Sequence, residues 1–134
     1  MRICLDTNIL VSAFFFDGNE RKVLELAKDG KYELILSNWI LFELKKVLTR
    51  MRVPERMRSA YVVRVRSISR IVRPVVGGLK SKIRDQSDRK VAGTAIAGSC
   101  VFLVTGDKEL LEVGRVANVK IIRSHQLLSS FRHR

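Results

Sequence analysis

The sequence predicts an α/β protein with a three-layer α/β/α fold around a central, mostly parallel sheet of four or five strands. Continuous apolar runs occupy residues 3–5, 34–36 and 101–104, and a weaker run occupies 119–122. Unbroken runs are typical of parallel strands that helices cover on both faces. Segments with helical spacing separate the runs, and this alternation favours a parallel sheet between two helical layers. The length of 134 residues suits a single domain, residues 1–134.

The first helices have recognisable starts and stops. The segment 19–29 has an apolar face and ends before Gly30, a common helix breaker. Ser37 or Asn38 can cap the next helix, which we expect to run to about residue 49.

Later helices follow the same logic. Pro54 suits the first turn of a helix, and the apolar stripe that continues from it consists of Met57, Tyr61, Val65, Ile68 and Val72. Gly77-Gly78 is the expected loop. Ser87 can cap a helix over residues 88–98, and further helices are expected over 108–113 and 124–131.

The positive charge of the chain is local. The net charge is +13, and residues 44–84 hold thirteen Lys or Arg residues against one acid, Glu55. Such a basic segment favours a polyphosphate partner, although a solvated basic helix is the plainer alternative. The longest uncharged stretch, residues 91–106, is shorter than the roughly 20 residues of a membrane helix. Cys4 and Cys100 lie in or beside apolar runs without metal-site spacing, so we expect buried thiols and a cytoplasmic protein.

Two aspartates follow predicted strands directly. Asp6 comes after the first run, and Asp107 follows the run 101–104 after Thr105-Gly106. Ligands bind beyond the carboxyl ends of strands in open α/β sheets, so both acids are candidate site residues. Each can also serve only as a helix N-cap.

Two further acids fall on the inward faces of predicted helices. Glu43 lies between Trp39 and Val47 on an apolar face, where an ion pair with an arginine is the alternative to a site role. Asp88 lies in the apolar arc of its helix, and a favourable interaction with the helix dipole is its alternative explanation. Four carboxylates can share one site if divalent cations neutralise them, and all-oxygen ligation selects Mg²⁺ or Mn²⁺.

Four separated motifs around these acids resemble those of PIN-domain nucleases. They are DTNILVSA at residues 6–13, ILS at 35–37 with FEL at 42–44, Asp88 with Lys90, Ala92 and Ala95, and LVTGD at 103–107 followed by Leu110-Leu111. The similarity spans nearly the whole chain, and it is greatest to a toxin subgroup related to the VapC-type toxins of toxin–antitoxin systems.

The resemblance implies a PIN-like nuclease domain that hydrolyses single-stranded RNA. Asp6, Asp88 and Asp107 would hold Mg²⁺ or Mn²⁺, and Glu43 would orient or deprotonate the attacking water. It also implies a cognate antitoxin as partner and a homodimer. Residues that could support the acids are Thr7, Asn8, Ser37 and Thr105, and those that could follow RNA phosphates from one helix face are Arg56, Arg66 and Arg70.

One motif departs from the family pattern. The subgroup usually carries Asp-Pro-Asp-Asp before the third motif helix, whereas this chain has Asp85-Gln86-Ser87-Asp88. Asp88 still falls on the inward face of its helix, so we take it as the metal ligand. Asp85 is the alternative ligand if Asp88 does not bind the metal. The departure leaves an alternative function open, a PIN-like RNA-binding module with little or no catalysis.

Overall fold

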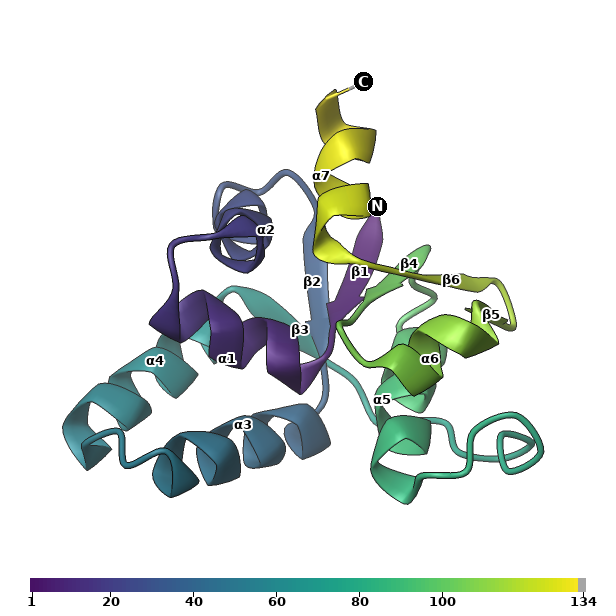
Figure 1. Ribbon diagram of the computed structural model, residues 1–134, viewed down its shortest axis with the longest axis horizontal. Helices are drawn as coiled ribbons and strands as arrows, with labels where there is room; N and C mark the ends of the chain where they lie inside the picture. Colours follow the sequence, from purple (N-terminus) through teal and green to yellow (C-terminus); the bar gives the residue numbers. More distant parts are fainter. Residues whose placement is uncertain (133–134) are drawn as a thin grey trace.

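A computed structural model describes residues 1–132 and shows a twisted six-stranded sheet between two groups of helices (Figure 1). The strand order is β3-β2-β1-β4-β6-β5, and every pairing is parallel except that of β5 with β6. The strands are β1 (Arg2–Leu5), β2 (Glu33–Leu36), β3 (Ser69–Ile71), β4 (Phe102–Val104), β5 (Arg115–Val116) and β6 (Val119–Ile122). The predicted three-layer α/β/α class with a mostly parallel sheet is confirmed.

The helices separate into two layers. One layer comprises α1 (Thr7–Phe15), α2 (Asn19–Lys28), α3 (Asn38–Arg50), α4 (Glu55–Ser67) and α7 (Ser124–Arg132), and the other comprises α5 (Gln86–Ala97) and α6 (Lys108–Val113). Helix α5 packs against β1, β2 and β4, while α6 packs against β6. The carboxyl ends of the parallel strands therefore open between α1 and α3 on one side and α5 and α6 on the other.

The helix expected to continue to Val72 ends earlier. Helix α4 ends at Ser67, and the chain then forms β3, whose continuation donates a hydrogen bond from the Val72 N–H to the Leu36 carbonyl. Ile68 and Val72 fit a helical stripe, but pairing with the exposed edge of β2 satisfies the backbone here instead. Together with the short β5, this strand brings the sheet to six strands rather than four or five.

The cap of α5 also differs from the expectation. Asp85, not Ser87, is its N-cap, and the Asp85 carboxylate accepts a hydrogen bond from the Asp88 N–H at 2.9 Å. Ser37 caps α3 as expected, by accepting from the Ile40 N–H.

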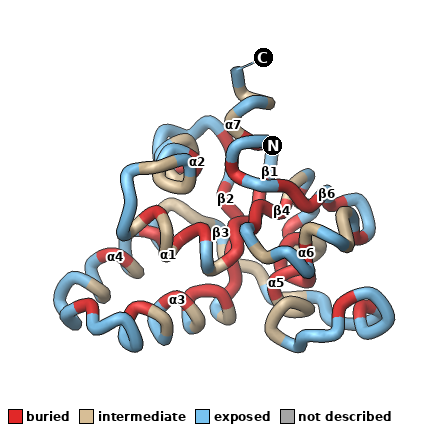
Figure 2. Tube along the Cα trace, in the orientation of Figure 1, coloured by how far each residue is buried: buried red, intermediate tan, exposed pale blue. Residues whose placement is uncertain are grey.

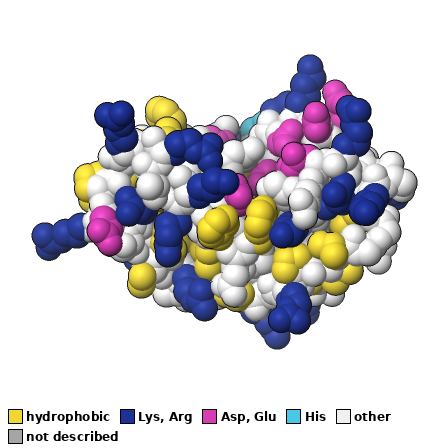
Figure 3. Space-filling view, turned by 90° about the horizontal axis from the view of Figure 1, so that it is seen from below, with side chains coloured by type: hydrophobic (Ala, Val, Ile, Leu, Met, Phe, Trp, Pro, Cys, Tyr) yellow, Lys and Arg dark blue, Asp and Glu magenta, His cyan; other side chains and the backbone are white. Residues whose placement is uncertain are grey.

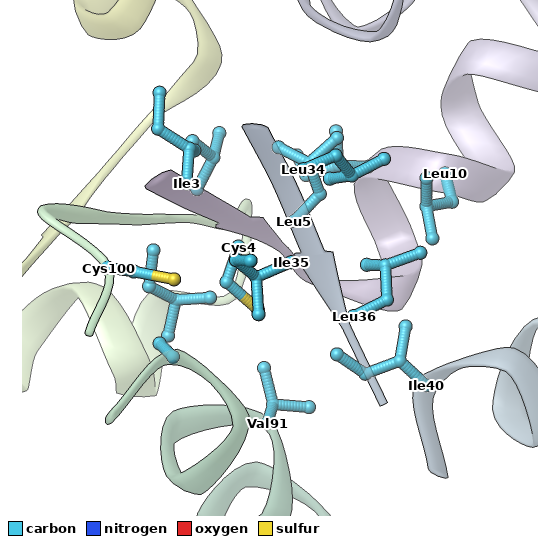
Figure 4. Close-up of a cluster of buried hydrophobic side chains, with 14 of the residues drawn as sticks. Ile3, Cys4, Leu5, Leu10, Leu34, Ile35, Leu36, Ile40, Val91 and Cys100 are labelled. Atoms are coloured by element: carbon cyan, nitrogen blue, oxygen red, sulfur yellow. The ribbon is translucent and has the colours of Figure 1, made fainter. Parts of the chain in front are cut away.

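The core lies between the sheet and both helical layers, as the buried central strands in Figure 2 show. Ile3, Cys4 and Leu5 are fully buried, and their strand pairs in register with β2 and β4. Cys4 and Cys100 are buried free thiols, as expected, and both belong to this core (Figure 4). No helix in residues 1–132 is long and apolar enough to span a membrane.

Candidate active site

The four predicted carboxylates line one pocket at the carboxyl edge of the sheet. Asp6 follows β1, Asp107 follows β4, and Glu43 and Asp88 project from α3 and α5. The pocket has a volume of about 340 Å³. Figure 3 views this end of the molecule and shows acidic side chains gathered along a hollow, with Lys and Arg side chains on both sides of it.

Asp6 is the most buried of the four acids, with 6% of its surface exposed. It caps α1 by accepting from the Thr7 N–H at 2.7 Å, and its other oxygen accepts from the Thr105 hydroxyl at 2.7 Å. Burial raises the pKa of Asp6, the two hydrogen bonds lower it, and the nearby Asp107 and Glu43 raise it. Asp6 therefore both caps α1 and belongs to the acidic cluster.

Thr105 joins Asp6 to the segment that carries Asp107. Its fully buried hydroxyl donates to Asp6 and accepts from the Asp107 N–H at 2.9 Å. Asp107 in turn caps α6 by accepting from the Glu109 N–H at 2.9 Å. One hydroxyl thus fixes the relative positions of two acids that follow different strands.

Asp88 is half-buried in the first turn of α5. Burial, followed by the negative charges of Asp107, Asp85 and Asp6, raises its pKa from 3.8 to about 7. Burial together with closely spaced carboxylates produces such a shift, and acids with a perturbed pKa in a cleft are typical of functional sites.

Glu43 is half-buried and forms no ion pair with an arginine among residues 1–132. The ion pairs found in residues 1–132 join Glu33 to Arg2 and to Arg70, so the proposed alternative for Glu43 is wrong. Its helix brings Val47 and Met51 to the same pocket, each four residues further on.

The residues expected to support the acids divide into two groups. Thr7 and Thr105 bond to Asp6, and the Asn8 side chain accepts from the Gly106 N–H at 3.4 Å. Ser37, by contrast, bonds to the buried Thr94 hydroxyl at 2.8 Å and holds α3 against α5. The sequence did not indicate the apolar part of the pocket lining, which consists of Val11, Phe15, Phe16, Val47 and Met51.

The expected arginine row does not form. Arg70 lies in β3 and pairs with Glu33 at 3.3 Å, because α4 ends before it. Arg66 donates to the Asn38 side chain at 3.2 Å, and Arg56 lies in the first turns of α4. The three arginines therefore do not lie on one face of one helix.

The donor set fits a hard divalent cation. Within the described chain, no three His, Cys, Asp or Glu side chains already form a metal-binding group. Mg²⁺ keeps several waters and needs only one or two carboxylates, and the acids of this pocket can supply them. Asp107 and Glu43 both raise the pKa of Asp6, and Asp107 and Asp6 both raise the pKa of Asp88, so all four acids lie close to one another.

Residues 2–109 match the family model of the PIN domain, so the chain belongs to the PIN-domain family. Members of this family are nucleases that generally depend on divalent metal ions. The fold is similar to that in the crystal structure of VapBC2 from Rickettsia felis bound to a DNA fragment from their promoter (TM-score 0.64, 23% identity, covering 92% of this chain and 98% of that one).

It is also similar to PAE2754 from Pyrobaculum aerophilum, with a TM-score of 0.69 and 19% identity over 100% of this chain and 91% of the other. Both likenesses concern the fold. A search of curated protein sequences gave no significant match.

Proposed function

We propose that this PIN domain is a Mg²⁺- or Mn²⁺-dependent ribonuclease that hydrolyses phosphodiester bonds of single-stranded RNA. The observation that supports it most is the gathering of Asp6, Glu43, Asp88 and Asp107 in one pocket, where the pKa of Asp88 rises to about 7. Holding these charges together is unfavourable without a cation, so the arrangement favours metal binding over a structural purpose.

In this mechanism Asp6, Asp88 and Asp107 would hold the metal ion, directly or through water. When bound, the ion supplies Lewis-acid polarisation of the phosphoryl oxygen. Glu43, on the opposite helical layer from Asp88, orients or deprotonates the attacking water. The hydrogen bonds from the Thr105 hydroxyl and the Thr7 N–H fix Asp6 in place and favour its ionised form. Hydrolysis would leave a 5′-phosphate and a 3′-hydroxyl.

The test compares wild type with Asp6→Asn, using Asp17→Asn as the matched control. Asn keeps the ability to cap α1 but removes the charge, and Asp17 is an exposed acid outside the pocket. We expect Mg²⁺-dependent cleavage of single-stranded RNA by wild type and Asp17→Asn, its loss in EDTA, and a loss of at least roughly 100-fold in Asp6→Asn. Equal cleavage by all three proteins would refute the proposal.

We also propose that the chain is the toxin of a toxin–antitoxin pair and forms a homodimer in the cytoplasm. The fold likeness to VapBC2 supports this. An apolar cleft of about 420 Å³ between α1, α2 and α4 is a candidate contact surface for a protein, with Phe14, Leu24, Val65 and Ile68 in its lining. Co-expression with the product of a neighbouring small gene, followed by light scattering of the purified complex, tests both points.

A second candidate function is RNA binding without turnover. It is favoured by the Asp85-Gln86-Ser87-Asp88 sequence, in which Asp85 is engaged as a cap. It predicts RNA binding that weakens steeply with salt, together with no product in Mg²⁺ or Mn²⁺.

A further inference from the structure

The pocket that holds the four acids has a second, apolar wall. Phe15, Phe16 and Met51 line it together with Val11 and Val47. Phe16 is 66% exposed and Met51 51% exposed, although both are large apolar side chains. The two phenylalanine rings lie 6.3 Å apart, with an angle of 52° between their planes. In Figure 3, hydrophobic side chains lie directly beside acidic ones on this face.

We propose that this wall, defined by Phe15, Phe16 and Met51, is a subsite for one unpaired base of the RNA, next to the phosphodiester that is cleaved. The proposal rests on the ribonuclease function above and adds the contact that holds the strand. No Lys or Arg lines the described pocket, so the wall suits an uncharged, flat group rather than a phosphate. Stacking on an aromatic face accepts any base, because every base presents a π-face.

The position of the wall explains why a base, rather than another apolar group, is the fitting occupant. It shares one volume of about 340 Å³ with the acids, at the small end of the range for ligand pockets. A strand whose phosphate reaches the acids must place a neighbouring nucleotide within this volume. Only an unpaired base can turn its face to the wall, which gives a physical reason for preferring single-stranded RNA.

A positive charge on the helix that carries part of the wall also favours a nucleotide of RNA as the occupant. Arg50 lies on α3 three residues after Val47 and one before Met51, so it adjoins the pocket-lining stripe of this helix. It is exposed. Arg50 is therefore an exposed cation on the helix that carries Val47 and Met51, available to the phosphates of a strand that enters the pocket.

The experiment measures binding of a fluorescent single-stranded RNA in Ca²⁺, with cleavage in Mg²⁺ followed in parallel. The variants are Phe16→Ala and Phe16→Tyr, and Phe42→Ala is the matched control because Phe42 is an aromatic residue, 55% exposed, outside the pocket. We expect about tenfold weaker binding for Phe16→Ala, the size of one stacking contact, and near wild-type binding for the other two.

A second series removes one base at a time from the RNA. An abasic nucleotide beside the cleaved bond should weaken binding by wild type about tenfold, and should cause no further loss in Phe16→Ala. Wild-type binding and cleavage by Phe16→Ala would overturn the subsite and point to a partner protein as the occupant of the wall. Equal losses in Phe42→Ala would also overturn it.

The two proposals fail in different ways. RNA that wild type binds but never cleaves refutes the nuclease function, while the abasic series still decides the subsite. RNA cleaved equally by wild type and Phe16→Ala refutes the subsite and leaves the nuclease function standing. RNA that wild type does not bind at all refutes both.

Discussion

Thr105→Val should destabilise the protein in a pH-dependent manner. Valine has nearly the shape of threonine, so the fully buried site stays filled. The variant loses the hydrogen bond to Asp6 and leaves the Asp107 N–H without its acceptor. A hydrogen bond to a charged group contributes about 1.5–3 kcal/mol, and leaving the part-buried Asp107 N–H without its acceptor adds a cost of about 1 kcal/mol. We expect a loss of about 2–4 kcal/mol in the free energy of unfolding at pH 8.

The sign of the pH dependence follows from the Thr105 hydrogen bond, which lowers the pKa of Asp6. Burial has already raised that pKa, so folding stability falls as pH rises and Asp6 ionises in the folded chain. Without Thr105 the pKa rises further and ionisation costs more. The loss in Thr105→Val should therefore be larger at pH 8 than at pH 4.5.

Urea unfolding in EDTA at the two pH values measures the effect. Thr94→Val is the matched control, because Thr94 is also fully buried and bonds to the Ser37 hydroxyl and the Lys90 carbonyl, with no carboxylate. Its loss should be the same at both pH values. If Thr105→Val shows no greater loss at pH 8 than at pH 4.5, Thr105 does not hold Asp6 in its ionised form.

Three further changes have expected outcomes. The pKa of Asp88 is raised from 3.8 to about 7, so ionisation of Asp88 lowers the stability of the fold as pH rises through this range. In thermal unfolding without metal, Asp88→Asn should therefore be about 1 kcal/mol more stable than wild type at pH 8 but not at pH 4. Asp88→Asn should also lose the stabilisation that we expect Mg²⁺ to give wild type. In urea unfolding, Asp107→Ala should lower the free energy of unfolding by about 1 kcal/mol because it removes the N-cap of α6, whereas Asp107→Asn should not, because asparagine can also cap. Gly93→Ala should cost about 1–3 kcal/mol, because its Cβ would overlap the Val75 carbonyl oxygen, and a wild-type melting temperature would contradict this.

Much of the fold could be predicted because its strands are buried on both faces. Such strands carry unbroken apolar runs, and the runs around Cys4, Ile35 and Leu103 form the three adjacent strands β1, β2 and β4. The end of α4 could not be predicted in the same way. A stripe at Val65, Ile68 and Val72 fits a helix, and only pairing with β2, distant in sequence, ends the helix at Ser67.

The acids of the site could be located because strand ends and helical faces can be predicted from the sequence. The residues that these acids contact could not be predicted. Asp85 and Ser87 are both good caps, and the choice between them depends on how the preceding loop enters α5. Phe16 gives no sequence signal for the pocket, because it lies just past the end of α1 and its direction is set by the packing of that helix against α2 and α3.

The geometry also explains how the protein tolerates an acidic cluster before a metal ion binds. Asp6 and Asp107 are N-caps of α1 and α6, and Asp88 lies in the first turn of α5. Each carboxylate therefore faces the positive end of a helix dipole, which favours negative charge by about 0.3–1 kcal/mol per helix. Glu43, in the second turn of α3, has no such support. Three helix starts thus hold together the acids that would bind the metal ion in the proposed mechanism, and the fourth, Glu43, is the acid to which that mechanism gives the attacking water.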